Sequence, residues 1–254
     1  ATQIEGGECG HNWNDWYHKG RIKDNSNPAR ATGHYNLWKQ DTDLMAEMKI
    51  KYYRLGIEWS RICPEEGKVN QDAISHYRDE LSYMKEKGIS PLLTIHHFTN
   101  PMWFENKGGF TKKENLKYFL DFVELTVKSF GDLVSEYITI NEPNVYATLS
   151  YHDGAWPPGE KSTKQAIRVM SNMVICHIKA YELIHKIRKE MGYDDTKVSF
   201  AHHVRVFDPE NPGNPWHRVC TRLLERFFQG ALTKAMLTGK ITWPLKGNTE
   251  ITPG

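Results

Sequence analysis

Segments with strand periodicity alternate with segments of helical periodicity along most of this chain. Four runs are rich in β-branched and aromatic residues and are bounded by turn residues, which is typical of strands. These runs are residues 52–59, 89–98 and 197–204, together with the start of the stretch 136–144. Between them, apolar residues recur at helical spacing, as in Leu116, Phe119, Val123 and Val127. The alternation predicts consecutive right-handed βαβ units and a parallel sheet.

The two ends of the chain add one strand and one helix to this pattern. Gln3 is expected at the end of a first strand, because a glycine pair follows it closely. The last helix is expected to bury one face, formed by Val219, Leu223, Phe227, Ala231 and Leu232. Five strands result, whereas a closed (β/α)8 barrel needs eight. An open sheet of this kind has two unpaired edges, which favour association.

Composition places the chain among ordinary globular proteins. It is 39% hydrophobic and 25% charged, and its formal net charge is +2 with the basic residues scattered. We therefore expect no nucleic-acid partner and no anionic membrane partner. No apolar run approaches the roughly 18 residues of a membrane span, and the amino end has no signal-peptide core. The four cysteines form no Cys-x-x-Cys pair and are interpreted as free thiols, so we expect a cytoplasmic protein.

The stretch 136–144 starts as a strand and ends in an amide, a carboxylate and a proline. Pro143 has no N–H group for a sheet ladder, so regular pairing should stop near it. Asn141 and Glu142 then lie at the carboxyl end of a strand, where α/β sheets and barrels hold their ligands. A carboxyl group on a rigid strand beside an amide is a candidate acid/base centre. The alternative is a surface carboxylate that faces water.

An arginine and two histidines stand at the other strand ends. Arg54 is flanked by apolar residues, which predicts that it is buried against a carboxylate. That carboxylate belongs either to a structural ion pair or to the active site. His96 and His97 are adjacent on a strand and point to opposite faces, so they cannot both bind one metal in the ordinary way. We expect no metal site, and at least one of the two histidines should face the site-bearing end of the sheet.

Four sequence blocks in order resemble the β-glycosidases of glycoside hydrolase family 1. The blocks are Gln3-Ile4-Glu5-Gly6, residues 53–62, Thr94–Phe98 followed by Pro101 and Trp103, and Thr139-Ile140-Asn141-Glu142-Pro143. The resemblance runs along the whole chain and corresponds to about the first half of a family member. It implies an α/β fold of the TIM-barrel type. Residues 1–254 would then form a partial (β/α)8 barrel catalytic domain, roughly the first five βα units, with strands 1 to 5 and their helices.

The same resemblance implies a retaining β-glycosidase that needs no cofactor. Its substrates would be β-glucosides or related β-linked saccharides and aryl glycosides. Glu142 would be the general acid and then the general base, and Asn141 would hydrogen-bond the sugar 2-hydroxyl. Arg54 would lie against the nucleophilic carboxylate and keep it ionised. Gln3 and His97 would bind hydroxyls of the non-reducing sugar.

Departures from the family pattern set the alternatives. The family's nucleophile motif, Ile/Val-Thr-Glu-Asn-Gly, and its Trp-rich eighth-strand motif are both missing, so the nucleophile is expected outside this chain. Glu58 is the other strand-end carboxylate and is interpreted as structural. Phe98 stands where members often have Trp, and His203 stands near where many have Asn.

Two competing functions follow from these gaps. One is an inactive half-barrel that binds sugar weakly or assembles with another chain, either a complementary carboxyl-terminal half or a second copy through open sheet edges. The other, a metal-dependent TIM-barrel hydrolase, is disfavoured by the histidine spacing.

Overall fold

A computed structural model describes residues 2–247, with side chains described from residue 4 onward. The chain divides into two compact units. The first consists of Ala1–Asn141 and Ala180–Phe200, and the second of Glu142–Lys179 and Ala201–Gly254. Helix α9 (Thr163–Glu190) contributes to both units.

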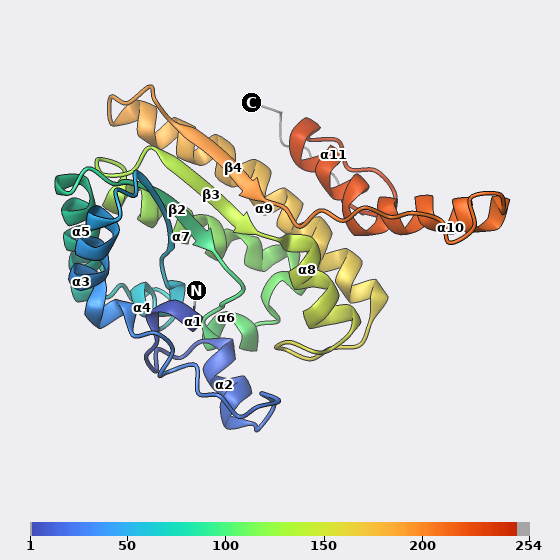
Figure 1. Cartoon of the computed structure of the whole chain (residues 1–254), viewed down its shortest axis with the longest axis horizontal. Coiled ribbons are helices and arrows are strands. Elements are labelled where there is room, and N and C mark those ends of the chain that lie inside the picture. The colour runs from blue at the N-terminus through green and yellow to red at the C-terminus, as the bar shows by residue number, and fades with distance from the viewer. Residues whose placement is uncertain (1, 248–254) are drawn as a thin grey trace. The chain divides into compact units, whose positions relative to one another are not determined.

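A four-stranded sheet organises the described residues (Figure 1). Its strands are β1 (Tyr52–Gly56), β2 (Ser90–His96), β3 (Glu136–Asn141) and β4 (Lys197–Ala201). Their order in the sheet is their order in the sequence, and β1, β2 and β3 pair in parallel. The four later strands predicted from periodicity are therefore confirmed. Strands β1, β2 and β4 end before the apolar runs that predicted them. Trp59–Ile62 form helix α4, and no described ladder continues past His96 or Ala201.

The first strand, expected to end at Gln3, is not formed. Thr2–Glu5 make a short helix, α1, instead. Gly6 and Gly7 follow with φ angles of 74° and 92°. A ladder needs several consecutive extended residues, and these left-handed glycines stop any extension directly after Glu5. As a result, β1 is an edge of the described sheet, which has four strands rather than five.

The first unit contains several helices, of which α5 (Gln71–Glu86) packs directly on the sheet. The helices are α2 (Asn12–His18), α3 (His34–Glu47), α4, α5, α6 (Met102–Asn106), α7 (Leu116–Phe130) and the later part of α9. Helix α5 begins where the Asn70 side chain accepts the N–H groups of Asp72 and Ala73. It packs against β2, α3 and α7 through residues such as Leu81, which is fully buried. The apolar stripe predicted on α7 is confirmed, since Val127 is also fully buried.

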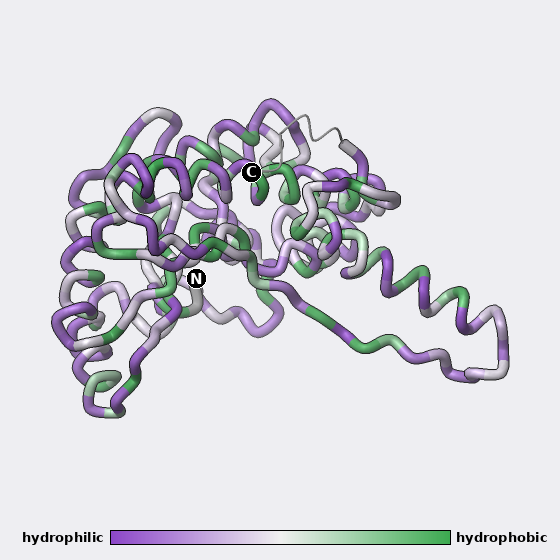
Figure 2. Tube along the Cα trace, turned by 90° about the horizontal axis from the view of Figure 1, so that it is seen from above, coloured by the Kyte–Doolittle hydropathy of each residue, from purple (hydrophilic) through white to green (hydrophobic). Residues whose placement is uncertain are grey.

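The second unit is built from helices α8 (Pro143–Ala147), the first part of α9, α10 (Pro215–Glu225) and α11 (Ala231–Thr238). Its core contains Tyr146 and Leu232. Hydrophobic and hydrophilic stretches alternate along α10 (Figure 2), yet this helix buries none of its residues. Val219 and Leu223 are 42% and 43% exposed, so their predicted burial is wrong. The predicted burial of Ala231 and Leu232, which belong to α11, is confirmed. No described part of the second unit buries the apolar face of α10 on which Val219 and Leu223 lie.

No helix among residues 2–247 combines the length and the apolar character that crossing a membrane requires.

Candidate active site

Polar side chains from three neighbouring strands meet in the first unit. The register pairs Thr94 of β2 with Gly56 of β1 and Ile138 of β3, so the carboxyl ends of these strands lie side by side. Arg54 Nε donates to Thr94 Oγ1 at 2.8 Å, and Arg54 Nη2 donates to Asn141 Oδ1 at 2.5 Å. One guanidinium therefore connects β1, β2 and β3 at their ligand-binding end.

The contact with Arg54 determines how the Asn141 amide is oriented. Asn141 is only 3% exposed, and its oxygen must face the guanidinium because arginine can only donate hydrogen bonds. The amide N–H2 group then points the other way, available to a ligand hydroxyl. Both residues were predicted as site residues from the sequence. Their contact was not predicted, because it depends on the neighbour order of β1, β2 and β3.

Arg54 is more exposed than its sequence neighbours suggested. Arg54 is exposed to solvent, so its predicted burial is wrong. Leu55, the next residue, is buried on the other face of β1. Tyr52 and Arg54 lie on the same face of β1 and are both exposed, so this face of the strand is open.

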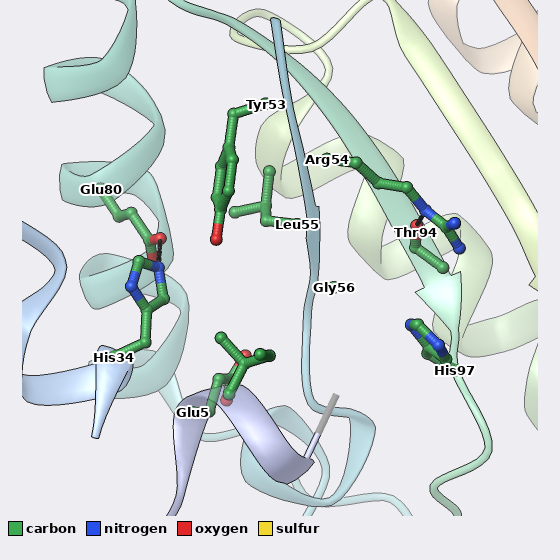
Figure 3. Close-up of a pocket in the computed structure, with 10 residues that line it drawn as sticks. Glu5, His34, Tyr53, Arg54, Leu55, Gly56, Glu80, Thr94 and His97 are labelled. Carbon is green, nitrogen blue, oxygen red and sulfur yellow. Dashed lines mark hydrogen bonds and ion pairs between the residues drawn. The ribbon is translucent and has the colours of Figure 1, made fainter. Parts of the chain in front are cut away.

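His97 follows the carboxyl end of β2, where the sequence predicted that at least one of the two adjacent histidines would face the site. It lines a cavity of about 250 Å³ together with Arg54 and Thr94 (Figure 3). Burial lowers the pKa of His97 to about 3, and the positive charge of Arg54 adds to this effect. His97 is thus neutral near pH 7 and can hydrogen-bond a hydroxyl group. His96 points to the opposite face, where its ring contacts Phe110 edge-on at 5.3 Å between centroids.

The other side of the same cavity holds buried ionisable groups that sequence reasoning missed. Figure 3 shows His34, Glu80 and Glu5 across β1 from Arg54. Burial raises the pKa of Glu5 to about 7, and the Tyr77 hydroxyl lies 2.9 and 2.8 Å from its two oxygens. These residues are far apart in the sequence and share no motif, so no sequence signal pointed to the cluster.

His34 lies between two carboxylates. Its Nδ1 is 2.5 Å from Asp41 Oδ2 and its Nε2 is 2.9 Å from Glu80 Oε1. Burial alone would lower the pKa of His34, but the hydrogen bonds to Glu80 and Asp41 raise it to about 9. Both ring nitrogens can donate only in the imidazolium form, so this histidine is charged near pH 7.

Glu142 has a strained backbone where the chain leaves β3. Its φ and ψ are 40° and 61°, in the left-handed region, and it directly precedes Pro143 at the start of α8. This region is unfavourable for a non-glycine residue and costs about 1–3 kcal/mol. Two hydrogen bonds hold the conformation: Glu142 N donates to the Ala201 carbonyl at 2.8 Å, and Tyr146 N donates to the Glu142 carbonyl at 3.0 Å. Strain of this kind clusters at active sites.

The Glu142 side chain is 32% exposed and faces His203, with 3.8 Å between Oε1 and His203 Nδ1. The buried Asn144 side chain donates to the His203 carbonyl at 2.8 Å. Arg205 Nε donates to His203 Nε2 at 3.0 Å. From the sequence, His203 was only a departure from the family pattern; the structure places it beside the candidate acid/base.

The remaining candidates have simpler positions. Gln3 belongs to α1, and its side chain lies outside the part of the chain with described side chains. Glu58 is 4% exposed and caps α4 by accepting the Ser60 N–H at 3.3 Å and hydroxyl at 3.0 Å, which confirms its structural interpretation. Within residues 2–247, no group of three or more His, Cys, Asp or Glu side chains is arranged to hold a metal ion. All four cysteines are free thiols.

Comparison with known sequences shows one family. Residues 1–248 match the sequence pattern of glycosyl hydrolase family 1. The β-glucosidase A of Thermotoga maritima is 32% identical over 199 residues, which are 78% of this chain and 44% of that relative. The β-glucosidase A of Acetivibrio thermocellus is 34% identical over 201 residues, with coverage of 76% and 44%.

Solved structures agree with this result. A β-glycosidase from Pyrococcus horikoshii matches with a TM-score of 0.84 and 32% identity, over 95% of this chain and 54% of that one. A family 1 β-glucosidase from Thermotoga maritima in complex with isofagomine lactam matches with a TM-score of 0.87 and 28% identity, over 95% and 55%. The chain thus spans about half the length of the proteins it matches. Its fold is that of part of a TIM barrel.

Proposed function

This chain belongs to glycosyl hydrolase family 1, and we propose that it supplies the acid/base half of the active site of a retaining β-glycosidase. The proposed substrates are β-glucosides and related β-linked saccharides or aryl glycosides. The β-glucosidase names of its relatives support this substrate class. The observation that carries the proposal is the strained Glu142 directly after Asn141, whose amide is held by Arg54.

The proposed reaction has two displacements. In the first, Glu142 gives its proton to the glycosidic oxygen while a carboxylate outside this chain attacks the anomeric carbon. The bond between the anomeric carbon and the leaving oxygen breaks, and a glycosyl–enzyme ester forms. In the second, the Glu142 carboxylate takes a proton from water, whose oxygen attacks the anomeric carbon and releases the nucleophile. Two inversions give net retention.

The other predicted residues bind or orient. We assign to the Asn141 amide N–H2 group a hydrogen bond to the sugar 2-hydroxyl, which strengthens in the oxocarbenium-like transition state. Arg54 orients this amide and supplies a positive charge for the nucleophilic carboxylate. His97 is neutral and binds a sugar hydroxyl, and Gln3 is assigned to the same sugar.

The experiment that tests this function replaces Glu142 with Gln in the protein that carries this chain together with its nucleophile. Hydrolysis of phenyl β-glucoside needs protonation of its leaving group, so kcat/KM should fall by roughly 10²–10⁴. Hydrolysis of 2,4-dinitrophenyl β-glucoside needs little protonation, so its kcat/KM should change far less. An equal loss for both substrates would contradict the assigned role.

Glu136→Gln is the matched control for this experiment. Glu136 is a carboxylate at the first residue of β3, whereas Glu142 directly follows the last one, and Glu136 pairs with Lys197 at 2.9 Å. The Lys197 side chain of this pair is 76% exposed, so solvent screens the ion pair and the substitution should affect stability little. Both substrates should be hydrolysed at nearly the parent rate. If the parent protein and both variants fold but none of them hydrolyses either substrate, the result would favour the half-barrel hypothesis.

A further inference from the structure

We propose that His203 is a positioning residue for Glu142, holding one oxygen of its carboxyl group through Nδ1–H, and that Arg205 selects the tautomer this requires. The inference rests on the proposed acid/base role of Glu142 and adds residues to that role. All the contacts involved lie within the second unit.

The Arg205 contact determines where the imidazole proton lies. Arg205 Nε carries a hydrogen and can only donate, so His203 Nε2 accepts at 3.0 Å. A neutral imidazole has one N–H group, which must then be on Nδ1. Nδ1 is the nitrogen that faces Glu142 Oε1 at 3.8 Å. This separation is longer than a hydrogen bond, and catalytic contacts commonly shorten when substrate binds.

Neighbouring side chains hold both His203 and Arg205 in place. Asn144 is fully buried and donates to the His203 carbonyl at 2.8 Å. Gln229, 8% exposed, accepts the Arg205 N–H at 2.8 Å and donates to the Arg205 carbonyl at 2.9 Å. The Phe228 ring contacts the His203 ring edge-on, with 5.8 Å between the centroids. The Arg205 guanidinium lies over the same Phe228 ring, 4.9 Å from its centroid. The imidazole is thus fixed in position, plane and tautomer.

The arrangement has a consequence for proton transfer. The Glu142 backbone is fixed, but its side chain is 32% exposed and can rotate. A donor at Oε1 restricts this rotation and leaves Oε2 to carry the transferable proton. Oε1 can accept the same N–H whether Glu142 is protonated or ionised, so one orientation serves both displacements. His203 therefore acts through Glu142.

Nuclear magnetic resonance reads the tautomer without requiring catalysis. The full chain is labelled with ¹⁵N-histidine, and long-range ¹H–¹⁵N correlations of the ring are recorded near pH 8. The His203 signals are assigned by their loss in His203→Asn. We expect a protonated Nδ1 and an unprotonated Nε2, and we expect Arg205→Met to remove this preference. A His203 ring with its proton on Nε2 in the parent chain would overturn the proposal.

Two substitutions of His203 test the effect on the reaction in the protein that includes the nucleophile. Asn places an N–H donor near the Nδ1 position, whereas Gln places one near Nε2. For phenyl β-glucoside, His203→Gln should lower kcat/KM by about tenfold, the loss expected for one hydrogen bond, and His203→Asn should retain most activity. For 2,4-dinitrophenyl β-glucoside, both variants should stay near the parent rate.

The outcomes separate this inference from the function it rests on. If Glu142→Gln discriminates between the two glucosides but His203→Asn and His203→Gln behave alike, the positioning role is wrong and the acid/base role stands. If Glu142→Gln does not discriminate, the acid/base role itself is wrong, and the positioning role falls with it.

Discussion

Glu142 combines three structural tasks in one residue: it follows β3, caps α8 and presents a carboxyl group. The sequence predicted that pairing stops near Pro143, because proline has no N–H group. It did not predict the left-handed backbone at Glu142, which is disfavoured for a residue before proline. That conformation depends on the hydrogen bond to Ala201, about sixty positions away along the chain. A long-range contact therefore shapes the site in a way that local patterns do not encode.

Arg54 illustrates the same limit for contacts between side chains. A charged residue among apolar ones signals a need for partners, and this part of the prediction was useful. Which residues serve as partners depends on the neighbours of β1 in the sheet, and these proved to be Thr94 and Asn141. Burial was overestimated because it depends on whether another element covers that face of the strand, which the residues flanking Arg54 do not reveal.

His34 provides a prediction for pH dependence. Its pKa is 6.5 when free and about 9 in the folded chain, so folding favours the protonated form. The stabilisation it provides should be fully present below pH 6.5 and should be lost as the pH rises from 6.5 to about 9. The slope is at most about 1.4 kcal/mol per pH unit. Urea unfolding at several pH values, comparing the parent with His34→Gln, measures this contribution.

His18→Gln is the matched control for the His34 measurement. His18 also faces a carboxylate, that of Glu8 at 3.2 Å, but the His18 side chain is 60% exposed. Exposed pairs of this kind contribute little to stability. We expect the difference in unfolding free energy from the parent to shrink with rising pH for His34→Gln only. A difference that is constant from pH 6 to 9.5 would contradict the assigned charge on His34.

At the scale of elements, periodicity predicted which segments are helices better than it predicted which faces are covered. The stripes on α7 and α10 are both amphipathic, as the sequence indicated. Phe119 and Val123 on α7 are fully buried, whereas Trp216 and Leu224 on α10 are 74% and 57% exposed. A helical pattern specifies that an apolar face exists. Whether another element covers it depends on the tertiary arrangement.

Paired leucine substitutions test the layer formed by α5 on the sheet. Leu81→Ala on α5 removes a fully buried side chain and should lower the free energy of unfolding by about 2–5 kcal/mol. Leu44→Ala on α3 removes a side chain that is 57% exposed and should change it by less than about 0.5 kcal/mol. Urea denaturation followed by circular dichroism measures both. Similar losses in the free energy of unfolding for the two variants would contradict the packing of α5 on the sheet.

At the scale of the whole molecule, strand order was predictable because right-handed βαβ connections place successive strands side by side. The absence of a strand at Gln3 and the division into two units were not predictable, since both depend on contacts between distant segments. The chain spans about half the length of its relatives, and its sequence has no Thr-Glu-Asn-Gly nucleophile motif. The reaction proposed for Glu142 therefore needs a carboxylate from outside these 254 residues.

Chemical rescue of Glu142→Ala by azide tests the acid/base assignment most directly. In the protein that includes the nucleophile, 2,4-dinitrophenyl β-glucoside should still form the glycosyl–enzyme ester, but water should attack it slowly without a general base. Azide has no proton to lose, so it should attack through the space left by the removed carboxyl group and raise turnover by on the order of 10². The expected product is β-glucosyl azide. No acceleration, or an α-glucosyl azide, would contradict Glu142 as the acid/base, and the α product would identify it as the nucleophile instead.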